Sequence, residues 1–219
     1  MCCGVVVNQI LFLEGLRMTK PINASLIMTT LPMVVIGASA VLLKEMITKK
    51  KMVGILLGAL GVVMIIAYGH RVTITRIGMI GDLLIFLNAF CFGLFLVLIK
   101  PLLLRYHAFQ LMSVIFGIGT LILSVTTGNE VFHTPWKTLP GSVLLAISYV
   151  VLLTTFVAYI MNTYALARLK ASVVGIYIYL QPVVATSIAL FLGKDDLNVI
   201  KIIGAFLIFV GIFLVSRED

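Results

Sequence analysis

Charged residues are scarce in this chain. Asp, Glu, Lys and Arg make up 11% of its 219 residues, whereas hydrophobic residues make up 62%. A soluble domain is roughly half apolar and a quarter charged. A water-soluble fold of this size could not bury so much apolar surface, so most helices must face lipid. The shortage of charge excludes a soluble domain and predicts an integral membrane protein.

Cysteine and histidine are also scarce, with three of each. The cysteines lie in apolar stretches and the histidines are isolated in expected loops. Neither set has the spacing of a disulfide framework or a metal site. The residues concerned are Cys2, Cys3, Cys91, His70, His107 and His133. The sequence motifs H-E-x-x-H and G-x-S-x-G are absent as well. We therefore expect no catalytic residue, no metal and no cofactor.

The basic residues outnumber the acidic ones, 16 to 8. They stand singly or in short clusters between apolar runs, where membrane proteins keep them on the cytoplasmic side. This placement argues against a nucleic-acid partner. The densest cluster lies within Lys44–Lys51, and we expect this end of the molecule to be cytoplasmic.

Long apolar runs recur along the chain. A transmembrane helix needs about 20 predominantly apolar residues. On that rule we expect eight helices, at residues 1–16, 24–44, 52–69, 79–101, 108–127, 141–166, 171–193 and 199–216. The predicted fold class is all-α: a polytopic helical bundle of about eight spans in a multi-pass membrane protein.

The two ends of the chain resemble each other. A shift of 150 residues, without gaps, superposes identical residues at many positions and one acidic pair, which indicates an internal duplication. The identical positions include Leu16/Leu166, Lys20/Lys170, Pro32/Pro182, Val34/Val184, Leu42/Leu192, Lys44/Lys194, Lys51/Lys201, Gly54/Gly204, Leu57/Leu207 and Gly61/Gly211, and the acidic pair is Glu45/Asp195. Duplication in so apolar a chain is typical of transporters built from repeats.

The offset also predicts how the repeats are arranged. Residues 1–69 would form a partial first repeat of three helices, and residues 79–216 a second repeat of five. Equivalent helices are five spans apart, an odd number, so the repeats would have inverted topology. A complete five-plus-five duplication would place two further helices ahead of Met1, and we expect an N-terminally truncated chain.

Three stretches carry a resemblance to a known family. They are ASLIMTTLPMVVIGASAVLLKE followed by MVGILLGALGVVMI, then GDLLIFLNAFCFGLFLVLIKPLL, and finally YALARLKASVVGIYIYLQPVVATSIALFLGKDDLNVIKIIGAFLIFVGIFLVS. The chain resembles the EamA-domain permeases of the drug/metabolite transporter superfamily. The resemblance implies ten helices in two inverted halves, location in the cell membrane (the inner membrane in bacteria), and movement of a small-molecule substrate through a central cavity.

Polar residues within the expected spans are the candidates for that cavity. Gln9 and Tyr159 are equivalent under the 150-residue shift, Asn8 is adjacent to Gln9, and Asn162 lies one turn after Tyr159. Such side chains either bind substrate or join helices by hydrogen bonds. Asn88 lies among Phe86, Phe90, Phe92 and Phe95, a composition that suits an amphipathic or aromatic metabolite, although phenylalanine in membranes more often faces lipid.

The seventh expected helix supplies the remaining candidates. Tyr177 and Gln181 are four residues apart and share one face, whereas Tyr179 points elsewhere. Pro182 and its equivalent Pro32 each free a backbone carbonyl one turn back. We expect these prolines to shape the cavity wall.

The acidic residues give little indication of ion coupling. Glu14, one turn before Arg17, and Asp82, near the start of its helix, are interfacial charges. A proton-coupled carrier usually has an acid deep in the bundle. Facilitated movement or exchange is therefore at least as credible as proton antiport.

Glycines mark the last helix of each repeat. Gly54, Gly58 and Gly61, with Gly204 and Gly211, have the spacing that lets helix backbones approach closely. The contact would lie within the molecule or at a homodimer interface.

Three functions remain open from the sequence. The first is a permease that moves a small metabolite or drug-like solute by alternating access between the repeats. The second is a non-transporting fragment, or a partner subunit that needs the missing helices. The third, an intramembrane lipid-modifying enzyme, would require clustered acids or histidines, and these are dispersed along the chain.

Overall fold

The computed structural model describes residues 6–67, 76–193 and 198–217, and helices make up the regular structure in these ranges. The α-helices are α1 (Val6–Met18), α2 (Pro21–Met28), α3 (Leu31–Leu42), α4 (Lys49–Ala67), α5 (Arg76–Leu103), α6 (Ala108–His133), α7 (Gly141–Tyr149), α8 (Ala158–Leu166), α9 (Ala171–Ile176), α10 (Leu180–Phe191) and α11 (Val199–Ser216). Three short segments join them: the 3₁₀ turns η2 (Trp136–Thr138) and η4 (Tyr177–Tyr179), and the π-helix η3 (Val150–Val157). Cys2, Cys3, His70, Asp195 and the expected helix limits at 1 and 69 lie outside the described residues.

The predicted all-helical membrane fold is confirmed. Among the described residues, six stretches are long and apolar enough to cross a bilayer. They are 23–42, 77–103, 108–125, 141–166, 171–191 and 199–216. The count of eight, which adds α1 and α4, remains a prediction.

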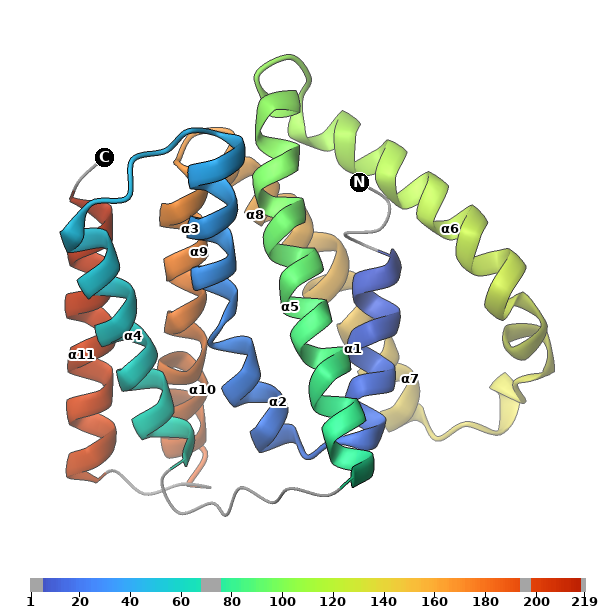
Figure 1. The fold of residues 1–219 in the computed structure, drawn as a ribbon. Helices are drawn as coiled ribbons and strands as arrows, with labels where there is room; N and C mark the ends of the chain where they lie inside the picture. The colour runs from blue at the N-terminus through green and yellow to red at the C-terminus, as the bar shows by residue number, and fades with distance from the viewer. Residues whose placement is uncertain (1–5, 68–75, 194–197, 218–219) are drawn as a thin grey trace.

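The expected helix 24–44 is broken into α2 and α3. Pro32 has no N–H to give to the carbonyl of Met28, so the helix cannot continue regularly through this point. The chain tightens instead, with hydrogen bonds from Thr29 N to Leu26 O at 3.1 Å and from Thr30 N to Ile27 O at 2.9 Å. Figure 1 shows the resulting step between α2 and α3.

Two other expected helices are also irregular. The 171–193 helix consists of α9, η4 and α10, and Pro182 lies in the first turn of α10, just after the 3₁₀ segment. The 141–166 helix passes from α7 through η3 into α8. Isolated π-helical turns are frequently found at functional sites. The 3₁₀ segment η4 interrupts the 171–193 helix at Tyr179. Tyr179 is the equivalent of Thr29, where the 24–44 helix is broken, so the two helices are interrupted at matching positions.

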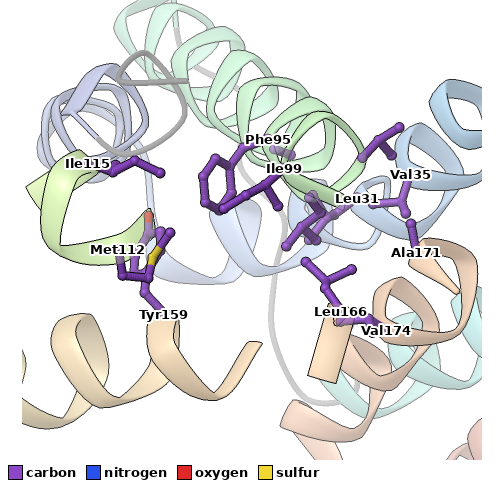
Figure 2. Packing of buried hydrophobic residues seen from close by; sticks show 13 residues of the cluster. Leu31, Val35, Phe95, Ile99, Met112, Ile115, Tyr159, Leu166, Ala171 and Val174 are labelled. Carbon is purple, nitrogen blue, oxygen red and sulfur yellow. The ribbon is translucent and has the colours of Figure 1, made fainter. Parts of the chain in front are cut away.

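Two hydrophobic clusters hold the bundle together. The first joins α3, α5, α6, α8 and α9 and includes Leu31, Leu96 and Leu166 at no more than 1% exposure (Figure 2). The second joins α3, α4, α9 and α11 around Ile176 and Ile208. In Figure 1, α5 crosses the front of the bundle between α3 and α1, while α6 slants outward from the top of α5.

Helices α4 and α11 approach closely through their glycines. A Cβ built on Gly54 would lie 2.7 Å from the carbonyl oxygen of Gly211, and one built on Gly204 would lie 2.8 Å from that of Gly61. Each glycine therefore meets the backbone of the opposite helix. The predicted tight packing is present, and it lies within the molecule.

Gly211→Ala should destabilise the bundle, because its new methyl group would meet the backbone of Gly54 and Gly58. Overpacking of this kind costs about 1–3 kcal/mol. Thermal unfolding in detergent measures the effect. Gly117→Ala on α6 is the matched control, because its Cβ would have no neighbouring atom within 4 Å. Equal unfolding temperatures for the two variants would contradict the close α4–α11 contact.

Candidate functional site

Three predicted residues from distant parts of the chain form one buried hydrogen-bond network. Asn8 Nδ2 donates to the Asn88 carbonyl at 3.1 Å, and Asn88 Nδ2 donates to the Asn8 carbonyl at 2.7 Å. The Tyr159 hydroxyl donates to Asn8 Oδ1 at 3.1 Å. All three residues are at most 8% exposed. The network joins α1, α5 and α8.

Gln9 lies at the edge of this network. Its Nε2 donates to Thr155 Oγ1 at 3.4 Å, and both side chains are half-buried. Thr155 belongs to the π-helix η3, which leads directly into the turn that carries Tyr159. The equivalent positions Gln9 and Tyr159 thus come close through their neighbours Thr155 and Asn8.

Aromatic rings surround the tyrosine. The rings of Phe92, Phe95 and Phe116 lie edge-on to Tyr159, with centroid separations of 5.8, 6.0 and 5.8 Å. These are favourable aromatic geometries. Phe86 and Phe90, on the other face of α5, are exposed. The expected phenylalanine cluster is therefore divided, with one face turned inward and the other outward.

The remaining candidates lie apart from this network. Asn162 is half-buried on α8, Tyr177 is 46% exposed, and Gln181 is exposed at the start of α10. Pro32 is buried beneath α5, and Pro182 is half-buried. The structure therefore groups Asn8, Gln9, Asn88 and Tyr159 and leaves Tyr177 and Gln181 on an outer face.

Tyr179 makes a contact that the sequence interpretation left unspecified. Its hydroxyl donates to the Thr29 carbonyl at 2.7 Å, and its ring lies on Gly58 of α4. Thr29 and Tyr179 are equivalent under the 150-residue shift, so the two helix breaks touch each other at matching positions. The offset was the signal that could have predicted this pair.

Charged groups lie near the helix ends. Arg17 Nη1 contacts Glu14 Oε1 at 2.9 Å, and the Thr19 hydroxyl donates to the Asp82 carboxylate. Glu14 therefore pairs within its own helix, whereas Asp82 accepts from Thr19, in the turn between α1 and α2. Among the described residues, no group of three or more His, Cys, Asp or Glu could hold a metal ion.

The network offers neutral hydrogen-bonding groups beside aromatic surfaces. At least one polar atom of each of these three side chains, Asn8, Asn88 and Tyr159, already forms a hydrogen bond to a neighbouring helix. A solute that bound here would have to replace one or more of these hydrogen bonds. Amide and hydroxyl groups in membrane helices serve both purposes, joining helices and lining solute pathways. Such a setting suits a membrane carrier better than a reaction centre.

Comparisons with known proteins agree with that reading. A profile of the EamA-like transporter family matches residues 2–67 and 79–217, which is most of the chain. The chain belongs to the EamA-like transporter family. Together with the six membrane-length helices, this makes it a multi-pass membrane protein of a transporter family.

The similar proteins come from bacteria and archaea. The chain is 28% identical over 221 residues to the uncharacterized transporter YyaM of Bacillus subtilis (strain 168), covering 97% of this chain and 70% of that protein. It is 27% identical over 205 residues to an uncharacterized transporter of Archaeoglobus fulgidus, covering 94% of this chain and 70% of that protein. A crystal structure superposes with a TM-score of 0.82 at 18% identity, over 99% of this chain and 75% of that one, which supports the fold.

Removing the Tyr159 hydroxyl should uncouple α8 from α1. In a double-mutant cycle of Tyr159→Phe with Asn8→Ala, we expect a coupling free energy of about 0.6 kcal/mol, the average for side-chain hydrogen bonds in a membrane protein. Unfolding in mixed micelles provides the four free energies. Tyr177→Phe is the control, because Tyr177 is 46% exposed and lies apart from the network, and it should change stability by less than about 0.5 kcal/mol. A coupling of zero would contradict the Tyr159–Asn8 bond.

Proposed function

We propose that this protein is a permease that moves a small metabolite or drug-like solute across the cell membrane by alternating access between two inverted repeats. The solute would pass the polar and aromatic network of Asn8, Gln9, Asn88 and Tyr159. The observation that carries the proposal is the symmetry of the contacts: Thr29 and Tyr179, which are equivalent under the 150-residue shift, share a hydrogen bond, and the glycine contacts of α4 and α11 are exchanged by the same shift.

The glycine contacts support an inverted arrangement. Gly54 packs against Gly211, and Gly61 packs against Gly204. Under the 150-residue shift Gly54 is equivalent to Gly204 and Gly61 to Gly211, so the shift converts one contact pair into the other. Exchange of partners in this way is the property of a contact across a twofold axis. Such an axis, lying in the membrane plane, relates the halves of inverted-repeat transporters.

The helix breaks support the same axis. A residue that touches its own equivalent must lie close to the axis that relates them. Tyr179 and Thr29 are equivalent and share a hydrogen bond, and each occupies the break of its own helix. Discontinuous helices near the bilayer centre commonly form the solute site of transporters.

Substitutions at the network should lower transport without preventing insertion. We expect Gln9→Ala and Tyr159→Ala each to reduce uptake by the purified chain in lipid vesicles about tenfold or more, because each removes polar contacts at the proposed pathway. A panel of radiolabelled small metabolites serves to find a transported solute first. Tyr177→Ala, on the outer face, should keep at least half of the parent rate. Normal flux in both network variants would remove these residues from the pathway.

One observation favours the second function, a chain that needs further helices. Helix α5 covers α3, with Gly93 packed against Val34 and Leu31. The equivalent positions on α10, Val184 and Gln181, are exposed, and no residue of α7, η3 or α10 is buried. This face of α10 therefore corresponds to the face of α3 that packs against α5, and a further helix could pack against it.

The same vesicle assay separates these two functions. A permease that is complete within these residues would take up solute as the purified chain alone. A chain that depends on added helices would show no uptake alone, and Val184→Cys in native membranes would cross-link to a second polypeptide. Uptake by the purified chain without such a cross-link would rule out the second function.

A further inference from the structure

The two repeats are tied together at one end of the molecule by a carboxylate. Glu45, in the turn between α3 and α4, accepts hydrogen bonds from the Ala171 backbone N–H at 3.3 Å and from the Ser172 hydroxyl at 2.8 Å. Ala171 and Ser172 form the first turn of α9, whose backbone N–H groups lack partners within the helix. The acid of one repeat therefore caps a helix of the other.

A buried lysine completes the tie. Lys51, in the first turn of α4, is 3% exposed, and its ammonium donates to Ser172 Oγ at 3.4 Å. The serine hydroxyl thus donates to an anion and accepts from a cation, which uses both of its hydrogen-bonding roles. Lys51 is buried while Glu45 is half-buried, so removing the Glu45 carboxylate would leave the Lys51 charge poorly compensated, and the three side chains depend on one another.

The backbone is shaped to hold Glu45 in this place. Lys44 has φ of 55°, a left-handed conformation that residues other than glycine seldom adopt. It reverses the chain at the end of α3, and the Glu45 N–H returns to the Ser39 carbonyl at 3.2 Å. Strain of this kind persists where surrounding contacts enforce it, often at switch regions.

Below the tie, α3 and α9 are in direct contact. All six residues of α9 are buried, and a Cβ added to Gly175 would lie 3.0 Å from Val35 Cγ1. The Lys100 ammonium of α5 adds a bond to the Leu169 carbonyl, just before α9 begins. This end of the bundle, which carries Lys49–Lys51, is therefore closed.

We propose that Glu45, Ser172 and Lys51 form a latch that keeps the Lys49–Lys51 end of the pathway shut, and that the latch must open in each transport cycle. The inference rests on the proposed alternating access, because only relative movement of the repeats would require Glu45 to leave α9. Glu45 and Lys51 are positioning residues here. They hold a gate and do not touch solute.

Side-specific labelling tests the latch without a known solute. The reporter is Ser39→Cys, in a chain with Cys2, Cys3 and Cys91 replaced by alanine. Ser39 is 1% exposed, beneath the latch. Glu45→Ala and Ser172→Ala should each raise its rate of modification by a membrane-impermeant maleimide, added at the Lys49–Lys51 end, about tenfold, because hydrogen bonds to charged groups contribute at least that factor to an equilibrium. Glu14→Ala, which removes an exposed acid on α1, is the control and should leave the rate unchanged.

A second reporter distinguishes a gate from general loosening. Ala189→Cys is equivalent to Ser39→Cys in the other repeat and should be modified more slowly from the opposite side when the latch is removed. Parent-like rates at Ser39→Cys in both latch variants, or faster labelling at both reporters, would overturn the proposal. Should Glu45→Ala fail to fold, Ser172→Ala, which removes one hydroxyl, decides the result. Absence of uptake by the parent chain would instead count against the proposed function, because labelling needs no transport.

Discussion

The hydrogen bond from the Tyr179 hydroxyl to the Thr29 carbonyl reconciles two interrupted helices with a membrane interior. Lipid offers no partners to backbone groups, so irregular backbone at this depth must be covered by protein or by a watery cavity. Proline at 32 and at 182 makes both helices irregular at equivalent places. Bringing the breaks together lets the Tyr179 hydroxyl, at one break, donate to the Thr29 carbonyl at the other. The ring of Tyr179 can reach that point because Gly58 leaves room for it on α4.

This central contact is flanked by two kinds of interface with different consequences for movement. The α4–α11 contact is made of backbone against backbone at four glycines, and it has little freedom to slide without steric clash. The α3–α9 contact is held at its end by hydrogen bonds among Glu45, Ser172 and Lys51. Polar bonds can be exchanged for water at a membrane surface, whereas a close-packed glycine interface has no such substitute. If the proposed alternating access occurs, these contacts favour a movement that pivots about α4 and α11 and opens between α3 and α9.

The sequence predicted the features that depend on composition and on repetition. Apolar runs located the helices, and the 150-residue offset paired Gly54 with Gly204 and Pro32 with Pro182. It did not predict contacts that depend on how helices rotate against each other. Asn8 and Asn88 are 80 residues apart and unrelated by the offset, so their reciprocal bonds depend on how α1 lies against α5. Thr155 was not a candidate, and Glu45 was noted only as the equivalent of Asp195, because a threonine in an apolar run and an acid in a basic turn show no role until packing gives each a partner.

In the proposed permease, the neutrality of the Asn8–Asn88–Tyr159 network would limit the kind of solute that passes it. Amides and a hydroxyl discriminate by hydrogen-bond pattern, and the rings of Phe92, Phe95 and Phe116 add apolar contact. A solute that carried a localised charge would lose its hydration without finding a counter-charge among these groups. A solute with a flat apolar part and a few polar atoms would lose much less. Passage of such a solute would require no ion to compensate charge, and the acids Glu14 and Asp82 make their contacts with Arg17 and Thr19 and not with this network.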